Sequence, residues 1–246
     1  MHFSEIVIVF AYGMVTALAT GLGAFPLYFR EKAEAFLGTG QVIAAALMTC
    51  ASLQLLNEAR KHDPLLGLLG IAAGVGLIVL TNLAVKRFPD VAQIIESDTA
   101  DGARKGFLIV FVMTIHSAAE GVGIGVSFGG GRELGTLISL TIALHNIPEG
   151  LAISLITVPR GMGVIKSAFW SIGTSLPQPI IGVIAFLFVM IFQPFLPFGL
   201  GLAAGAMFWM VGSELLPEAG QQLSIPKIVL IFLITSLLFV GLIVSL

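Results

Sequence analysis

Charged side chains are scarce in this chain of 246 residues: Asp, Glu, Lys and Arg make up 11% of it, whereas hydrophobic residues make up 57%. A soluble domain has about 25% charged residues, so the solvent for most of this chain must be lipid. The net charge is only −2, and the scattered basic residues form no basic face, which excludes a nucleic-acid-binding protein. We therefore expect an integral protein of the lipid bilayer.

Cysteine is almost absent too, since Cys50 is the one cysteine of the chain. One thiol can form neither a disulfide framework nor a cysteine-based zinc site within a single chain. The N-terminal segment Met1 to Phe10 lacks the basic region of a signal peptide, and its apolar run continues to about Phe29. We therefore interpret this segment as the first membrane helix.

Apolar segments of membrane-spanning length divide the whole chain. Crossing the hydrocarbon core of a bilayer takes about 20 apolar residues in a helix. Breaks at charged or Pro/Gly-rich gaps predict an all-α integral membrane protein, with residues 1–246 forming one transmembrane domain and residues 86–104 a loop. The eight predicted helices cover residues 4–29, 38–58, 64–85, 105–128, 132–158, 164–192, 195–217 and 226–245.

Lysine and arginine residues orient this bundle, because short loops rich in them stay in the cytoplasm. One side of the predicted bundle has Arg30, Lys32, Lys86, Arg87, Arg104, Lys105, Arg160, Lys166 and Lys227, and the other has Arg60, Lys61 and Arg132. The richer side is predicted to be cytoplasmic. In a multi-pass protein of the cell (inner or plasma) membrane, the 86–104 loop would then be inside and both termini outside.

Two of the predicted helices end in related sequences. Residues 53–59 (LQLLNEA) and 213–219 (SELLPEA) are identical at four of seven positions. The two helices run in opposite directions in the predicted topology, as an inverted repeat of helices 1–3 and 6–8 around central helices 4 and 5 requires. We interpret Glu214 and Glu218, near the end of the seventh helix, as interfacial caps.

Two predicted helices carry ionisable residues in the same pattern. An ionisable side chain deep in a membrane costs about 2.5–3.5 kcal/mol, so each needs a partner or a purpose. His116 and Glu120 lie in the fourth helix, and His145 and Glu149 in the fifth. A spacing of four residues puts each pair on one helix face. Both histidines fall near mid-segment, so antiparallel helices would bring all four side chains to one depth.

This set of side chains suits a metal ion. Two nitrogen and two oxygen ligands favour Zn²⁺, with Fe²⁺, Mn²⁺ or Cd²⁺ as further candidates. Pro148 would free a backbone carbonyl near the polar groups. Gly121, Gly123 and Gly125 would let another backbone approach the fourth helix closely. Gln178, between two prolines of the sixth helix, either forms a third wall of the site or makes an interhelical hydrogen bond.

These residues also carry a family resemblance. The sequence His-Asn-Ile-Pro-Glu-Gly at 145–150, preceded by His-x-x-x-Glu-Gly at 116–121, resembles the signature of the ZIP (Zrt-/Irt-like) metal transporters, particularly their bacterial and GufA-like branch. Further matches are Gly-Leu-Gly-Ala-Phe-Pro at 21–26, Ala-Leu-Met at 46–48 and Glu-Leu-Leu-Pro-Glu-Ala at 214–219. The resemblance covers all eight predicted helices, and it implies an eight-helix fold with outside termini.

The resemblance further implies roles for individual residues. The primary metal site would consist of His116, Glu120, His145, Glu149 and, from the second helix, Met48. A second metal of the kind that many ZIP proteins hold would use the positions of Ser117, Asn146, Glu149 and Gln178. Only one of these four positions is charged, so we expect one strong metal site rather than two. Relatives also suggest a homodimer.

The predicted function is transport of a divalent transition metal toward the cytoplasm by alternating access. The metal is the transported substrate, and we expect no separate cofactor and no enzymatic activity. The import direction rests on the resemblance. Because histidine and carboxylate ligands bind metal only when deprotonated, protons should compete with the metal.

Three other interpretations stay open. In one, the two motifs are intrahelical His–Glu pairs that neutralise each other in a packed bundle. In another, the same ligands belong to an intramembrane metalloenzyme that activates water or oxygen, although the chain has no His-Glu-x-x-His motif. In the third, a metal-independent, proton-coupled carrier uses the His–Glu pairs as a relay.

Overall fold

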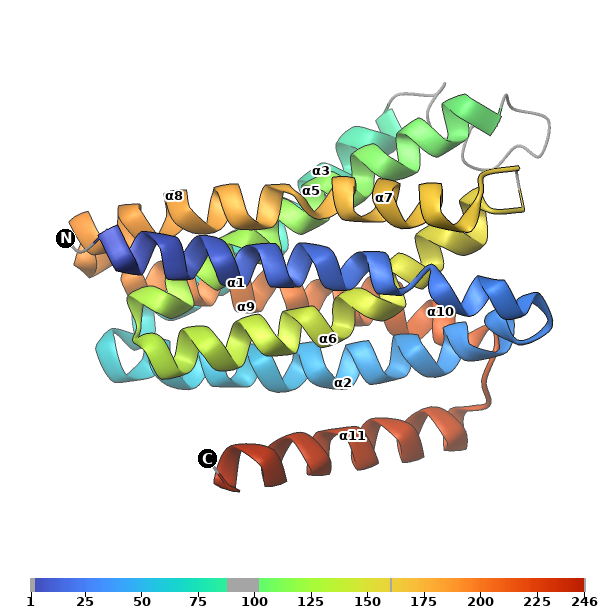
Figure 1. Cartoon of the computed structure of the whole chain (residues 1–246). Helices are drawn as coiled ribbons and strands as arrows, with labels where there is room; N and C mark the ends of the chain where they lie inside the picture. Colours follow the sequence, from blue (N-terminus) through green and yellow to red (C-terminus); the bar gives the residue numbers. More distant parts are fainter. Residues whose placement is uncertain (1–2, 88–101, 160, 246) are drawn as a thin grey trace.

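The chain is all-α over residues 3–87, 102–159 and 161–245, which the computed structural model describes (Figure 1). Its first half consists of α1 Phe3–Leu22, the 3-10 helix η1 Phe25–Phe29, α2 Arg30–His62, α3 Pro64–Arg87 and α5 Gly102–Gly129. Its second half consists of α6 Arg132–Thr157, α7 Val164–Ser175, α8 Pro177–Ile191, η2 Gln193–Phe195, α9 Leu196–Met210, the π-helix η3 Val211–Leu215, α10 Leu216–Gly220 and α11 Ile225–Ser245.

Six described segments are long and apolar enough to cross a membrane. They are Phe3–Phe29, Phe36–His62, Pro64–Leu83, Arg132–Thr157, Val164–Ile191 and Gln193–Gly220. Helices α5 and α11 have 28 and 21 residues, which also exceeds the length that a crossing needs. Together these elements confirm an all-α, multi-pass membrane protein, and six candidate crossings are found among the described residues, so eight crossings stay a prediction.

Two of the predicted helices are interrupted. The sixth is divided at Leu176 into α7 and α8, because Pro177 stands at the first position of α8 and has no N–H to continue the ladder. The seventh changes from α-helix to the π-helical turn η3 and back to α-helix in α10. A π turn takes one more residue than an α turn, so η3 shifts the helical register at this point.

Several boundaries also differ from the prediction. Helix α1 ends at Leu22, and η1 leads directly into α2 at Arg30, so the predicted gap 30–37 is helical. Helix α3 extends to Arg87 and α5 begins at Gly102, which shortens the predicted 86–104 loop at both ends. The predicted loop also contains acidic residues that lie outside the described part of the chain: Asp90, Glu96, Asp98 and Asp101.

A local cap connects α2 and α3. Asp63 lies between them in an extended conformation, and its Oδ1 accepts hydrogen bonds from the backbone N–H groups of Leu65 and Leu66 at 2.9 and 3.0 Å. Pro64 occupies the first position of α3, where a missing N–H costs nothing. These three neighbours explain why α2 ends at His62 and why α3 can begin at once.

Close backbone contacts hold pairs of helices together. A Cβ added at Gly23 or Gly150 would overlap a backbone carbonyl oxygen of the partner helix, so α1 and α6 touch through their backbones. The α3–α9 pair has the same kind of contact at Gly70, Gly74, Gly201 and Gly205. Small residues allow this approach in membrane proteins, where burial of apolar surface does not drive helix association.

The predicted close approach to the fourth helix is confirmed for two of its three glycines. A Cβ on Gly121 would lie 3.0 Å from the carbonyl oxygen of Gln178, and one on Gly125 would overlap that of Gly182, both in α8. Gly123 differs, because a Cβ there would make only ordinary contacts with Ala203 and Met207 of α9. Helix α5 is therefore packed tightly on α8 and less tightly on α9.

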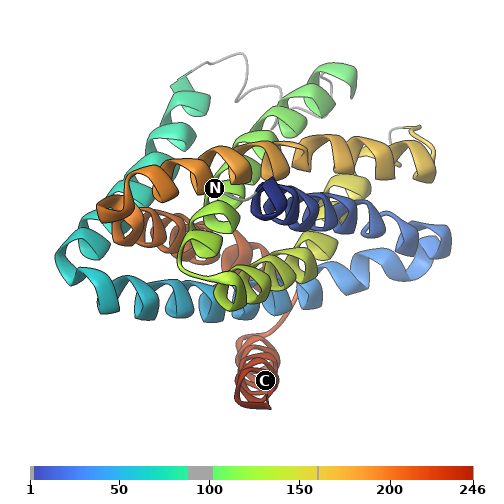
Figure 2. The same cartoon turned by 60° about the vertical axis from the view of Figure 1, so that its left-hand side comes forward.

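The remaining helices complete the arrangement. Helix α2 contacts both α6 and α9, while α11 packs on α2 and otherwise stands at the edge of the bundle (Figure 2). Helices α2 and α9–α10 run in opposite directions, and the two chain ends lie toward the same end of the molecule (Figure 1). An inverted repeat needs these directions, and the repeat itself stays a prediction, as does the side of the membrane on which the termini lie.

Candidate metal centre

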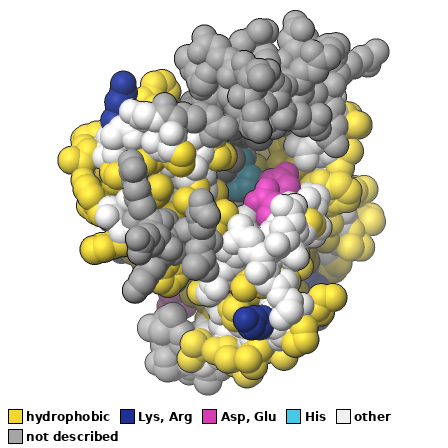
Figure 3. All heavy atoms as spheres, turned by 90° about the vertical axis from the view of Figure 1, so that its right-hand side faces the viewer, with side chains coloured by type: hydrophobic (Ala, Val, Ile, Leu, Met, Phe, Trp, Pro, Cys, Tyr) yellow, Lys and Arg dark blue, Asp and Glu magenta, His cyan; other side chains and the backbone are white. Residues whose placement is uncertain are grey.

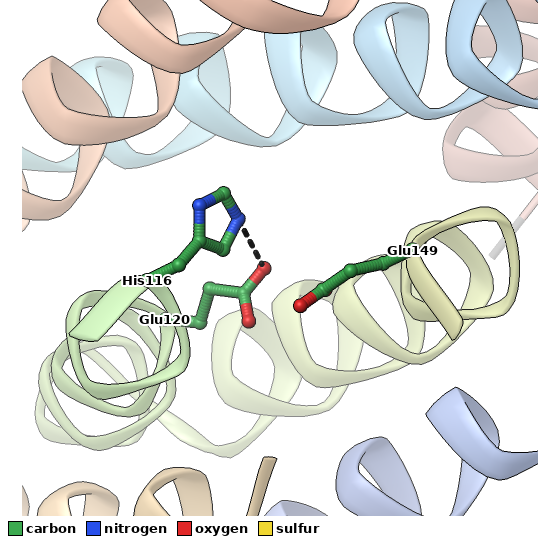
Figure 4. Close-up of side chains that lie close together, drawn as sticks. All are labelled: His116, Glu120 and Glu149. Carbon is green, nitrogen blue, oxygen red and sulfur yellow. Dashed lines mark ion pairs between the residues drawn. The ribbon is translucent and has the colours of Figure 1, made fainter. Parts of the chain in front are cut away.

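Three of the predicted ligands meet in the middle of the bundle. His116 and Glu120 project from α5 and Glu149 from α6, and one ligand atom of each lies within 4.8 Å of the others (Figure 4). His116 and Glu149 are partly buried, whereas Glu120 is fully buried. One nitrogen and two oxygen donors thus surround a space that a single cation could share.

The fourth predicted ligand, His145, contacts Glu120 on the neighbouring helix. Its Nε2 lies 2.6 Å from Glu120 Oε1, and His116 Nε2 lies 3.6 Å from the same oxygen. A carboxylate oxygen accepts, so the ring N–H of His145 donates. Among the described residues no ion pair joins His145 to Glu149, and the interpretation of two intrahelical His–Glu pairs is therefore wrong.

Glu149 faces the others without a hydrogen-bonding partner of its own. Both of its carboxylate oxygens are buried, and neither has a hydrogen bond within the part of the chain that the structure describes. A buried carboxylate without partners is costly in a membrane protein unless a cation or a proton satisfies it. In Figure 4 the Glu149 side chain points from α6 toward the carboxylate of Glu120. This orphaned group is the strongest structural indication of a cation site.

A second, neutral layer lies behind Glu120. Gln178 Nε2 donates to Glu120 Oε2 at 2.6 Å, and Asn146 Nδ2 donates to Gln178 Oε1 at 3.1 Å. Asn146 Nδ2 also donates to the backbone oxygen of Thr16 at 2.9 Å. Gln178 and Asn146 are fully buried. Of the two roles considered for Gln178, the interhelical hydrogen bond is the one that the structure contains.

A pocket of about 180 Å³ connects the cluster to one end of the molecule. Its wall includes His116, His145 and Glu149, together with Met48 from α2, which is buried. Figure 3 shows acidic and histidine side chains within a hollow at the end where α2 begins and α6 ends. Met48 thus lines the same pocket as the cluster, and its role as a ligand stays a prediction. Ser117 is buried outside the pocket wall, and its hydroxyl has no partner among the described residues.

The pocket also contains polar residues that the sequence did not indicate as part of the site. Glu214 and Glu218 were interpreted as interfacial caps, but both line the pocket, and so does Gln41 of α2. The Gln41 amide donates to Glu218, and its own Oε1 is buried without a partner among the described residues. The pair of glutamates four residues apart was the available signal, although the π turn η3, which contains Glu214, departs from regular α-helical spacing.

The chain has relatives among known proteins along most of its length, although no protein-family model matches it. It is 42% identical over 216 residues to the Arabidopsis thaliana protein At3g08650, named as a candidate zinc transporter; this match covers 87% of the chain and 35% of the plant protein. It is 29% identical over 230 residues to the zinc transporter GufA of Myxococcus xanthus, covering 84% of the chain and 88% of GufA.

A third relative is the zinc transporter ZIPB of Bordetella bronchiseptica, which is 32% identical over 125 residues. That match covers 50% of the chain and 40% of ZIPB. The chain therefore spans about a third of the length of the plant relative and most of the length of GufA. All three proteins have names that describe zinc transport.

Proposed function

The chain belongs to the ZIP family of zinc transporters, and we propose that it carries a divalent transition metal, Zn²⁺ before Fe²⁺, Mn²⁺ or Cd²⁺, toward the cytoplasm. The proposed site consists of His116, Glu120 and Glu149, with His145 and Met48 beside them. The metal is the cargo, so the site must bind it and also release it.

The unpartnered carboxylate of Glu149 is the observation that supports this proposal best. A cation between Glu149, Glu120 and His116 would satisfy both free oxygens with a mixed nitrogen and oxygen set, which suits Zn²⁺. His145 would become a fourth ligand if its ring turned away from Glu120 Oε1. Neutral ligands and bound water would complete the coordination sphere.

The pocket gives the proposed site a path to the side of the membrane that is predicted to be cytoplasmic. Its wall extends from Met48 and Glu149 to Gln41 and Glu218, near the end of the bundle that the distribution of basic residues predicts to be cytoplasmic. A metal at the cluster would thus be open to the inside in this conformation. Alternating access requires a second conformation in which the same cluster is open to the outside.

The helix contacts suggest how the bundle would change between these conformations. The ligands come from α5 and α6, and glycine contacts hold these helices to α8 and α1. The opposite pocket wall comes from α2 and η3–α10. We propose that the helices carrying the ligands move together against that wall, and that the working assembly is a homodimer in the cell membrane.

The other interpretations have less support. At3g08650, GufA and ZIPB are all named for transport, so an intramembrane metalloenzyme is set aside. A metal-independent carrier would need the His–Glu pairs as a proton relay, yet Glu149 has no hydrogen bond through which to receive a proton from the described residues. Such a carrier would keep working after complete chelation of transition metals.

Uptake into proteoliposomes tests the proposal directly. The parent chain should take up ⁶⁵Zn²⁺, and Glu149→Ala should abolish that uptake, because it removes the free carboxylate. Glu133→Ala is the matched control, since Glu133 is an exposed glutamate of the same helix. Normal uptake by Glu149→Ala would contradict the proposed site, and uptake of solute with all metal chelated would favour the metal-independent carrier.

A further inference from the structure

We infer that Gln178 is a positioning residue that restricts Glu120 to a single metal-binding oxygen and thereby favours Zn²⁺ over metals that take more oxygen ligands. This inference rests on the proposed function, because it concerns the selectivity of the same site. The residue acts through Glu120 and need not touch the metal.

The two oxygens of Glu120 have different surroundings. Oε1 faces the histidines, 2.6 Å from His145 Nε2 and 3.6 Å from His116 Nε2. Oε2 accepts the side-chain N–H of Gln178 at 2.6 Å. One oxygen therefore lies on the metal side of the carboxylate, and the other is occupied by an amide from α8.

Gln178 is itself held in one orientation. Its Oε1 accepts from Asn146 Nδ2, which also donates to the backbone of Thr16. Because Asn146 presents a donor, the Gln178 amide must turn its own N–H toward Glu120. The backbone is fixed as well, since a Cβ on Gly121 would lie within 3.1 Å of the carbonyl oxygen and Cα of Gln178. Helices α1, α6 and α8 thus cooperate to orient one carboxylate of α5.

This arrangement has a consequence for the choice of metal. Zn²⁺ commonly has four ligands, and one carboxylate oxygen is sufficient for it. Mn²⁺ prefers six ligands and mainly oxygen donors, so it gains more when a carboxylate binds through both oxygens. In two-oxygen binding by Glu120, the metal would compete with the Gln178 amide for the electron density of the buried Oε2, and the hydrogen bond would weaken. The amide therefore penalises Mn²⁺ more than Zn²⁺.

A purely structural role would also account for the hydrogen bonds, because polar side chains join helices in membranes. The two roles differ in their effect on selectivity. Loss of a structural contact would weaken the binding of every metal alike. Loss of a positioning contact would free Glu120 Oε2 and change the ratio of the two affinities.

The test is competition between Zn²⁺ and Mn²⁺ for the full chain purified in detergent, using the parent and Gln178→Met. Methionine has a similar volume and no N–H donor. Removing the outer partner of a metal ligand typically costs 10–100-fold in affinity, so we expect Zn²⁺ affinity to fall about tenfold. Mn²⁺ affinity should stay constant or rise. X-ray absorption of the bound Zn²⁺ should gain an oxygen neighbour.

Thr174→Val is the matched control, because Thr174 is fully buried one turn before Gln178 and its hydroxyl donates only to the backbone of Ser171. It should leave the Zn²⁺/Mn²⁺ ratio unchanged. If Gln178→Met does not fold, Asn146→Leu tests the same inference, because Asn146 orients the Gln178 amide. It should also lower the ratio of Zn²⁺ affinity to Mn²⁺ affinity. An equal loss for both metals, or no change, would overturn the inference. Absence of metal binding by the parent would instead contradict the proposed function.

Discussion

His145 and Glu120 form a contact between two helices, with 2.6 Å between Nε2 and Oε1, although each belongs to a motif that contains a potential partner of its own. His116 Nε2 lies 3.6 Å from the same oxygen, so Glu120 contacts both histidines. Glu149 is left without a partner among the described side chains. The two similar motifs therefore produce two different carboxylates, one satisfied and one free.

This difference predicts opposite effects of two matched substitutions on the metal-free protein. Glu149→Gln removes an unpaired buried carboxyl group, so the free energy of unfolding should stay constant or rise by about 1–3 kcal/mol. Glu120→Gln breaks the buried pair with His145 and should lower the free energy of unfolding by about 3–5 kcal/mol. Both should lose the stabilisation that Zn²⁺ gives to the parent. Thermal unfolding with and without Zn²⁺ measures all of these effects, and equal destabilisation by both variants would contradict the assignment.

Substitution of the two histidines should affect zinc affinity and protein stability differently. His116→Ala removes a ligand from the three-residue cluster, so Zn²⁺ affinity should fall by at least about a hundredfold while the metal-free protein stays folded. His145→Ala removes a partner 2.6 Å from Glu120, so it should destabilise the metal-free protein as well. Calorimetric titration and thermal unfolding of each variant separate these outcomes. A larger stability loss for His116→Ala would exchange the roles of the two histidines.

Zinc affinity should fall as the pH is lowered from 7.5 to 5.5. Protonated histidine and glutamic acid cannot bind metal, so each proton that zinc displaces makes the apparent affinity fall about tenfold per pH unit. The direction is fixed because protons and zinc compete for the same lone pairs. ⁶⁵Zn²⁺ uptake at a subsaturating concentration should decrease over this range, and saturating zinc should restore part of it. An affinity that does not change with pH would show that no ligand takes up a proton.

The glycine contact between α1 and α6 should be intolerant of a single methyl group. A Cβ at Gly150 would overlap the carbonyl oxygen of Thr20, so Gly150→Ala should cost about 1–3 kcal/mol and lower metal uptake by displacing Glu149. Gly76→Ala is the control, since a Cβ there meets nothing within 4 Å and alanine favours a helix. Normal stability and uptake of Gly150→Ala would show that the two helices can separate without penalty.

The orientation in the membrane can be measured because the chain has one cysteine. In a Cys50→Ser background, Arg132→Cys and Lys227→Cys place single thiols at exposed positions, one at the junction of α5 and α6 and one at the start of α11. The distribution of basic residues predicts that a membrane-impermeant maleimide labels the first in intact cells and the second only after permeabilisation. The opposite pattern would invert the topology and the proposed transport direction.

Much of the fold could be predicted because lipid imposes a simple rule on the chain. Each crossing needs about 20 apolar residues, so the gaps between them mark the helices. The i, i+4 spacing likewise placed His116 beside Glu120 on one face, as the structure confirms. These features depend on local spacing alone.

The partners across helices could not be predicted in the same way. The contact of His145 with Glu120 depends on how α5 and α6 are rotated about their axes, and no local spacing contains that rotation. The hydrogen bond from Gln178 to Glu120 depends in addition on the break at Leu176, after which Pro177 begins α8. The charged pocket wall was missed because the π turn η3 alters the direction in which Glu218 faces.

That π turn has a consequence for tolerance to insertions and deletions. Because η3 holds one residue more than an α turn, deletion of Gly212 would let α9 and α10 join as one regular helix. Glu218 would then keep roughly its present direction toward Gln41, because the π turn already absorbs the additional residue. The charge that lines the inner half of the pocket should therefore tolerate the loss of one residue at this turn, whereas the same loss within regular α9 would rotate every later side chain by about 100°.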